Sequence, residues 1–149
     1  MNIRVMKKDE IQRTLALVLT GYHRLAALDY TQEGVDTFYR LLQDSEAIRD
    51  AEFFGAFEGR EFLGVVAVRQ HRSHICFFFV EEERKNRNIG RQLFEHLLQN
   101  SEQNTITVNS APYAVDLYRS LGFTECDRQQ VRDGVLFTPM KYEKDSKLP

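Results

Sequence analysis

Apolar positions recur along the chain with two different periods, and the period changes near residue 51. In the first third they recur at helical spacing, over residues 11–22 and again over 35–42. Asp9 precedes the first of these stretches and is placed to cap its free N–H groups. A weakly alternating stretch over residues 2–6 predicts a short strand before both helices.

Beyond residue 51 the pattern is typical of β-strands. Runs over 51–58 and 62–69 flank Gly59, which favours a hairpin turn. The run over 74–80 is almost continuously apolar, which predicts a central strand buried on both faces. Simple alternation places four of its side chains on one face: His74, Cys76, Phe78 and Val80.

The last third alternates helices and strands. Helical spacing begins at Ile89 and ends near Asn100, and a β-branched strand follows over 105–109. Ser110 is placed to cap a second helix, which ends before Gly122. Two strands close the chain, over 123–128 and 134–142, with Asp133-Gly134 in the turn between them.

This order of elements predicts an α/β or α+β fold with a mixed sheet. The unit over 74–109 is a strand–loop–helix–strand crossover, so its two strands should run parallel. The 149 residues are one domain's worth, and we expect a single domain over 1–149.

Composition excludes several classes of protein. Apolar residues make up 42% and charged residues 28%, and 20 basic against 22 acidic residues leave a net charge of −2. That balance argues against a general nucleic-acid binder. Apolar runs are too short to cross a membrane, and the first residues lack the core of a signal peptide. Cys76 and Cys126 form no disulfide or metal pattern, so we expect core thiols in a cytoplasmic protein.

The most distinctive segment is the polar loop between the apolar strand and the helix that starts at Ile89. Backbone N–H groups converge at such a turn, and the helix dipole adds positive charge. The basic residues Arg84, Lys85, Arg87 and Arg91 crowd the same place, which indicates an anion site. Neither the nucleoside-triphosphate loop nor the dinucleotide fingerprint is present. A solvated charged connection is the competing interpretation.

Residues 85–90, Lys-Asn-Arg-Asn-Ile-Gly, resemble the pyrophosphate-binding signature [QR]-x-x-G-x-[GA] of the GCN5-related N-acetyltransferases (the GNAT family). Lys85 stands where the family has Gln or Arg, and Asn88 stands where it has its first Gly. Asparagine tolerates left-handed backbone geometry, so the loop can still form.

A second family signature, N-x-x-A-x-x-x-Y-x-x-x-G-F, matches further along the chain. Ala114, Tyr118, Gly122 and Phe123 are in register, while Ala111 stands where the pattern has Asn. Two motifs in the right order are far more specific than one. Residues 108–115 and 136–140 also resemble a bacterial subgroup of the family.

The resemblance implies a fold, a reaction and a donor. The fold is a central, twisted, mostly antiparallel mixed sheet flanked by about four helices. The reaction moves an acetyl group from acetyl-CoA to a primary amine of a small molecule or peptide, with no metal. A non-catalytic acyl-CoA binding or sensing domain of the same fold is the alternative. The donor-binding residues by resemblance are Phe78, Phe79, Val80, Lys85, Asn86, Arg87, Asn88, Ile89, Gly90, Arg91 and Asn109.

Two residues are candidates for proton transfer. The resemblance places the Tyr118 hydroxyl near the thioester sulfur, where a phenol can protonate the leaving thiolate. Packing in the core is the other interpretation of Tyr118. His74 falls where some members of the family carry a glutamate that acts as the general base, and a histidine can accept the amine proton near neutral pH. A water relay, with His74 only a polar residue at the strand start, is the alternative.

Two expectations concern what else the protein binds. By resemblance, the first two helices and the last hairpin form the acceptor pocket, but the residues there do not name the amine. The last strand carries Val135, Leu136 and Phe137, and a strand at the edge of the sheet can pair with another chain as a homodimer.

Overall fold

The computed structural model describes residues 1–7, 9–11, 14, 50–80 and 88–144. The predicted helix over 35–42 and residues 85–87 of the loop lie outside these ranges. The strands are β1 (Asn2–Val5), β2 (Glu52–Glu58), β3 (Glu61–Arg69), β4 (His74–Val80), β5 (Thr105–Ser110), β6 (Thr124–Glu125), β7 (Gln130–Arg132) and β8 (Val135–Glu143). The helices are α4 (Ile89–Asn100), the single 3₁₀ turn η2 (Pro112–Ala114) and α5 (Val115–Ser120).

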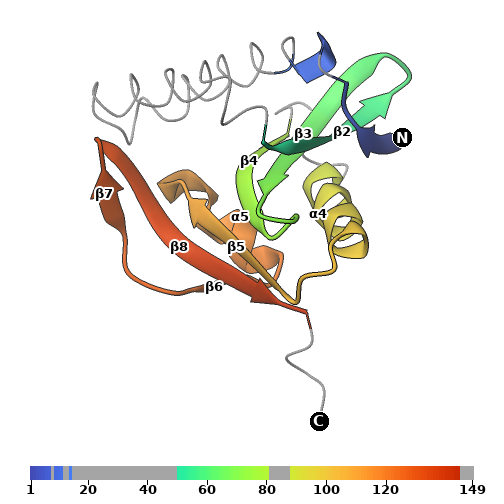
Figure 1. Ribbon diagram of the computed structural model, residues 1–149. Helices are drawn as coiled ribbons and strands as arrows, with labels where there is room; N and C mark the ends of the chain where they lie inside the picture. Colours follow the sequence, from blue (N-terminus) through green and yellow to red (C-terminus); the bar gives the residue numbers. More distant parts are fainter. Residues whose placement is uncertain (8, 12–13, 15–49, 81–87, 145–149) are drawn as a thin grey trace.

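The strands form one mixed sheet in the order β1-β2-β3-β4-β5-β8-β6, with β7 paired to β8 (Figure 1). Among the described strands only β4 and β5 run parallel, and every other pair is antiparallel. The predicted crossover and the mostly antiparallel mixed sheet are therefore confirmed.

Local sequence explains the β2–β3 hairpin and helix α4. Gly59 turns the β2–β3 hairpin with a φ of 61°, which glycine adopts without steric cost. Helix α4 has the bounds that its apolar spacing predicts, and it buries Ile89, Leu93, Phe94 and Leu97. Each of these side chains contributes about 1.5–3 kcal/mol by leaving water.

The core has two parts, one on each face of the sheet. The larger part joins α4 and α5 to inward side chains of β2 to β5 and β8, including Leu93, Tyr118, Ile106 and Met140. The smaller part lies on the opposite face around Phe53, Val65 and Ala67. We call these the helix face and the opposite face. In Figure 1, α4 lies alongside β2 to β4, and α5 lies behind β5.

Two predicted helix caps are wrong. The Lys7 carbonyl accepts the first helical hydrogen bond, from the Ile11 N–H at 3.0 Å, so the helix begins before Asp9. The Glu10 carboxylate accepts from the Lys7 N–H at 2.9 Å and caps that end instead. Ser110 is instead the last residue of β5, and its hydroxyl donates to the Ala111 carbonyl. Ser110 caps no helix, because the 3₁₀ turn that starts at Pro112 has Ala111 as its first flanking residue.

The predicted strand over 123–128 is also wrong, because only Thr124–Glu125 (β6) is a strand there and a separate short strand, β7, follows at Gln130–Arg132. The Asp127 side chain accepts from the Arg128 N–H at 2.8 Å, and this local bond competes with the ladder. β8 lies between β5 and β6 in the strand order, and β5 pairs with its residues 138–143. Val135, Leu136 and Phe137 pair with β7 alone among the described strands, so the homodimer stays a prediction. Cys126 is exposed at this bend, and is not the core thiol expected.

None of the helices within the described ranges is long and apolar enough to cross a membrane.

Candidate active site

The parallel pair β4–β5 opens shortly after it begins. The two strands are in register only at His74↔Thr107 and Ile75↔Val108, and then they diverge (Figure 1). From Cys76 to Val80, β4 is paired to β3 alone among the described strands. Backbone N–H and C=O groups need partners. The side of β4 that faces β5 is therefore an unpaired edge inside the sheet, suited to an extended chain that carries amides.

This opening explains why β4 is less buried than its sequence predicts. β4 is central, as expected, but only Ile75 is fully buried, and the other six residues are half-buried. A strand must be covered on both sides to bury a continuous apolar run, and β5 leaves β4 after two residues.

A β-bulge at Cys76 changes the direction of the β4 side chains. Ala67 of β3 lies opposite Phe77 and Val68 lies opposite Ile75, so Cys76 has no residue of β3 opposite it. Ile75 and Phe78 consequently both pack against the helix face, although they are three residues apart. The expectation that His74, Cys76, Phe78 and Val80 share one face is wrong, because the extra residue inverts the alternation.

The amino end of α4 lies beside the unpaired edge. Asn88 precedes the helix with φ 57° and ψ 30°, the left-handed conformation that the sequence predicts for it. Its carbonyl accepts the first helical hydrogen bond, from the Gln92 N–H at 3.0 Å. The Asn88 side chain makes no capping hydrogen bond, and the first turn of α4 holds no acidic residue. The free N–H groups and the helix dipole therefore favour an anion there.

Close packing joins that helix end to the strand. A Cβ built on Gly90 would lie 3.6 Å from the Phe78 ring and 3.7 Å from a methyl of Val80. Ile89 is fully buried in the core of the helix face. Phe78, Val80, Ile89 and Gly90, all predicted as donor-binding, are therefore brought together.

The other predicted donor-binding residues do not all lie at this junction of β4 and α4. Phe79 packs against the opposite face, so only its backbone can contribute to the unpaired edge. Asn109 is exposed near the end of β5. Arg91 donates to the Ser120 carbonyl at 2.8 Å, which draws its guanidinium toward the end of α5. Lys85, Asn86 and Arg87 lie outside the described residues.

Tyr118 projects from α5 into the core of the helix face. Its ring meets Phe78 edge-on with 5.9 Å between centroids, and it meets Phe123 at 5.3 Å. The side chain is only 5% exposed, and burial raises the pKa of its hydroxyl well above the usual value, with a smaller contribution from nearby Tyr113. Tyr118 is therefore protonated at neutral pH, and its hydroxyl is a weaker acid than a phenol in water. Both interpretations of this residue fit its position, since a core aromatic also reaches Phe78 at the unpaired edge.

His74 lies on the opposite face of the sheet from Tyr118. Its Nδ1 is 2.8 Å from the Thr107 hydroxyl, on the neighbouring parallel strand. Burial lowers the pKa of His74 below its usual 6.5, and the charge of Arg69 lowers it further. The imidazole is therefore neutral at pH 7, as a proton acceptor must be.

Sequence reasoning missed Arg69, the last residue of β3 and the register partner of His74. Its Nε is buried and has no hydrogen-bond partner in the structure. Burial raises the pKa of the neighbouring Cys76 thiol, and the positive charge of Arg69, together with a hydrogen bond from it, partly offsets that rise. Its position at the end of the apolar run over 62–68 is the one sequence feature of Arg69, and it does not distinguish a site residue from a solvated one.

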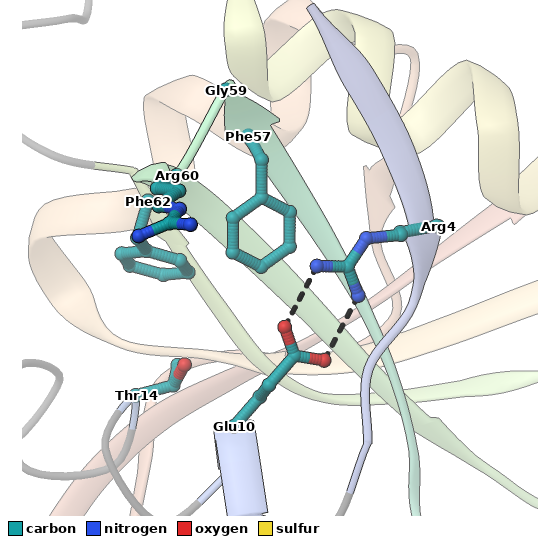
Figure 2. Close-up of a pocket in the computed structure, with 7 residues that line it drawn as sticks. All are labelled: Arg4, Glu10, Thr14, Phe57, Gly59, Arg60 and Phe62. Atoms are coloured by element: carbon teal, nitrogen blue, oxygen red, sulfur yellow. Dashed lines mark hydrogen bonds and ion pairs between the residues drawn. The ribbon is translucent and has the colours of Figure 1, made fainter.

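A hollow of about 600 Å³ is lined by residues of β1, of the first helical turn and of the β2–β3 hairpin. Figure 2 shows Arg4 and Glu10 facing each other across it, paired through two hydrogen bonds of 2.7 and 2.9 Å. The Arg4 guanidinium also lies 4.3 Å from the centre of the Phe57 ring. The charges of Arg4 and Glu10 in this hollow therefore neutralise each other.

The strand order, with one parallel pair that opens in front of α4, defines a class of protein, the GNAT acetyltransferases that the two motifs resemble. The chain belongs to this family, because the family model described as an acetyltransferase (GNAT) domain matches residues 26–144. The family's members are acyltransferases.

Three relatives illustrate the likeness. A UPF0039 protein of Schizosaccharomyces pombe is 37% identical over 67 residues, which are 42% of this chain and 44% of that protein. The chain thus spans less than half the length of this curated relative.

Two solved structures share the fold over nearly their whole length. A GCN5-related N-acetyltransferase from Rhodopseudomonas palustris has a TM-score of 0.80 at 16% identity, covering 95% of this chain and 94% of that one. The PaiA N-acetyltransferase from Thermoplasma acidophilum, in complex with coenzyme A, has a TM-score of 0.70 at 16% identity, with 96% and 99% covered.

Proposed function

We propose that this protein is an N-acetyltransferase that moves an acetyl group from acetyl-CoA to a primary amine of a small molecule or peptide, by direct attack in a ternary complex. The observation that carries the proposal is the unpaired edge of β4, from Cys76 to Val80, beside the uncapped amino end of α4. Coenzyme A has a part suited to each of these features. Its extended, amide-bearing arm suits the unpaired strand edge, and its phosphate groups suit the amino end of the helix.

The donor would bind along this edge. Backbone groups of Phe78, Phe79 and Val80 would take the pantetheine amides, in the way that an added strand pairs with a sheet edge. The pyrophosphate would lie against the N–H groups that follow Asn88, within the segment 85–91. Asn109, on the facing strand, would close the other side.

The transfer needs two proton movements. The neutral amine attacks the thioester carbonyl carbon, a C–N bond forms and the C–S bond breaks. The amine proton leaves to His74 or to a water chain, and the Tyr118 hydroxyl protonates the departing thiolate. His74 and Tyr118 lie on opposite faces of the sheet on either side of β4, which supports separate roles for them.

The burial of Tyr118 favours a second candidate of a different class. A tyrosine that is 5% exposed and packed against Phe78 and Phe123 is also what a purely structural residue looks like. The same fold would then serve as a non-catalytic acyl-CoA binding or sensing domain. The unpaired edge serves either function equally.

Binding and turnover measured on one sample distinguish these functions. Thermal unfolding is followed with acetyl-CoA, with free coenzyme A and with an equal concentration of pyrophosphate as the ionic control. We expect acetyl-CoA to raise the midpoint by several degrees and pyrophosphate to raise it little. A panel of amines is then tested for release of free thiol. Binding without turnover favours the sensing domain, and the lack of a shift with either coenzyme A species overturns both functions.

A further inference from the structure

A row of polar side chains crosses the opposite face of the sheet at the level where β4 and β5 are still paired. Arg69, His74, Thr107 and Lys141 are successive register partners on β3, β4, β5 and β8. The adjacent row consists of Val68, Ile75, Val108 and Met140, and all four belong to the core of the helix face. Side chains of neighbouring positions point to opposite faces, so the polar row points away from α4 and α5.

Arg69 is the cation of this row that has no acid as a partner among the described residues. Lys141 is paired to Glu143 at 2.9 Å, and nearby Arg72 holds Glu52 through two hydrogen bonds of 2.8 Å. No carboxylate in the described part of the chain pairs with Arg69 in this way. Its interaction with the Cys76 thiol engages a weak acceptor, and its Nε has none.

A half-buried guanidinium without a counter-ion is unusual, because a desolvated charge is costly unless an anion accompanies it. The guanidinium fork matches a carboxylate in two parallel hydrogen bonds. Thr107 adds a hydroxyl to the row, and Lys141 adds no free charge because Glu143 neutralises it. A single positive charge with no partner among the described carboxylates fits a singly charged carboxylate better than a doubly charged phosphate.

The position of Arg69 is suited to holding an acceptor. It lies directly across from His74, and cross-strand neighbours are about 5 Å apart at their Cβ atoms. The opening between β4 and β5 begins one residue beyond Ile75. A group held at Arg69 would thus lie beside His74, close to the point where β4 and β5 separate.

We propose that the acceptor is an amine that carries a carboxylate, such as an amino acid, and that Arg69 binds this carboxylate as a specificity-determining residue. This inference rests on the proposed acetyl transfer and goes further by naming the class of acceptor.

Matched acceptor pairs test the inference. Glycine, β-alanine, 4-aminobutyrate and a set of α-amino acids are each compared with their own carboxamide, using acetyl-CoA and a free-thiol readout. The comparison is conservative, because an amino amide has the less basic amine and therefore more of the reactive neutral form. The variants are Arg69→Gln, Arg69→Lys and, as the matched control, Arg128→Gln, which removes one exposed arginine that is not part of the row.

We expect the wild-type protein to favour at least one carboxylate over its amide by tenfold or more in kcat/KM, mainly through KM. Arg69→Gln should abolish that preference, Arg69→Lys should retain part of it, and Arg128→Gln should keep all of it. Equal rates with acids and amides, or a preference that survives Arg69→Gln, overturn the inference while acetyl transfer stands.

A binding measurement keeps the inference testable if no amine in the panel is acetylated. Calorimetry compares N-acetylglycine, N-acetyl-β-alanine and their carboxamides on the protein loaded with coenzyme A. Tighter binding of an acid that Arg69→Gln removes supports the inference, and equal or absent binding overturns it. If the protein fails to bind acetyl-CoA at all, the proposed function itself is wrong, so the two failures are distinguishable.

Discussion

The Nδ1 atom of His74 lies 2.8 Å from the hydroxyl oxygen of Thr107, at the point where β4 and β5 are still paired. That hydroxyl has two acceptors in reach for its one proton, the Nδ1 atom of His74 at 2.8 Å and the Ser73 carbonyl at 3.4 Å. In the tautomer that carries its proton on Nδ1, the lone pair is on Nε2, the nitrogen that can then accept a proton.

His74→Ala should remove the acidic limb of the kcat/KM profile. The base must be neutral to work, and burial together with Arg69 lowers the pKa of His74 below 6.5. Activity that depends on it is thus complete at pH 7 and is lost as the pH falls through that lowered pKa. We expect a loss of about 10²-fold at pH 7. The profile is measured for wild type, His74→Ala and His71→Ala, the last an exposed histidine of the preceding turn. An acidic limb that persists in His74→Ala assigns the proton to a water relay.

Tyr118→Phe should lower kcat and leave donor binding unchanged. The phenylalanine keeps the ring contacts with Phe78 and Phe123 and removes only the hydroxyl. If that hydroxyl protonates the thiolate, kcat falls by about 10²-fold. Free-thiol release gives kcat, calorimetry gives the Kd for acetyl-CoA, and Tyr113→Phe on the adjacent turn is the matched control. An unchanged kcat would leave Tyr118 as a core aromatic alone.

Substitutions at Asn88 should separate backbone geometry from side-chain chemistry. Its φ of 57° is accessible to Asn and Gly but strained for a β-branched residue. Asn88→Val should destabilise the fold by about 1–2 kcal/mol in urea unfolding, since the left-handed conformation costs about that much. Asn88→Gly should lose little stability and bind acetyl-CoA at least as tightly. Equal unfolding midpoints for the two variants would contradict a left-handed requirement here.

Gly90→Ala should be tolerated, and it should raise the free energy of unfolding by about 0.5–1 kcal/mol through helix propensity. The added methyl would stay 3.6 Å or more from Phe78 and Val80, which is ordinary contact. Gly64→Ala is the contrasting variant, because its methyl would lie 2.9 Å from the Phe79 carbonyl oxygen. Urea unfolding should show opposite signs for the two changes, and a destabilised Gly90→Ala would contradict the packing described between α4 and β4.

Glu10→Gln should make stability less sensitive to acid. Hydrogen bonds from the Arg4 side chain and the Lys7 backbone lower the pKa of Glu10 from 4.5 to about 2. A lowered folded-state pKa stabilises the fold above pH 4.5, and the effect is lost as the pH falls toward 2. Urea midpoints between pH 7 and pH 2 should therefore fall more steeply in wild type than in Glu10→Gln. Glu102→Gln, at an exposed residue, is the control, and parallel curves for wild type and Glu10→Gln would exclude a contribution from this pair.

Much of the second half of the fold is predictable from local signals. Helix α4 has the expected bounds at Ile89 and Asn100, and Asn88 takes the left-handed conformation that its residue type allows. The break at Asp127 was missed because one side-chain hydrogen bond outweighed a short β-like pattern. The bulge at Cys76 was missed because apolar residues on both sides of it hide the change of face.

Some residues of the candidate site were likewise predictable from the sequence, and others were not. The loop and helix residues around Asn88 and Gly90 are contiguous in sequence, so a motif could point to them. Arg69 could not be found in this way, because nothing within β3 distinguishes a cation that ends a strand from one in solvent. Only its pairing with His74 and its buried, unpartnered Nε make it notable.

The sequence by itself determined the order of the elements from β2 to α5, the parallel crossover and the family, because periodicity, turn residues and motif spacing act over short stretches of chain. Tertiary structure decided where β4 and β5 separate, which face each β4 side chain occupies, and that β8 lies inside the sheet. These depend on register between strands that are distant in sequence. Register is set by the packing of both faces together, which no local pattern encodes.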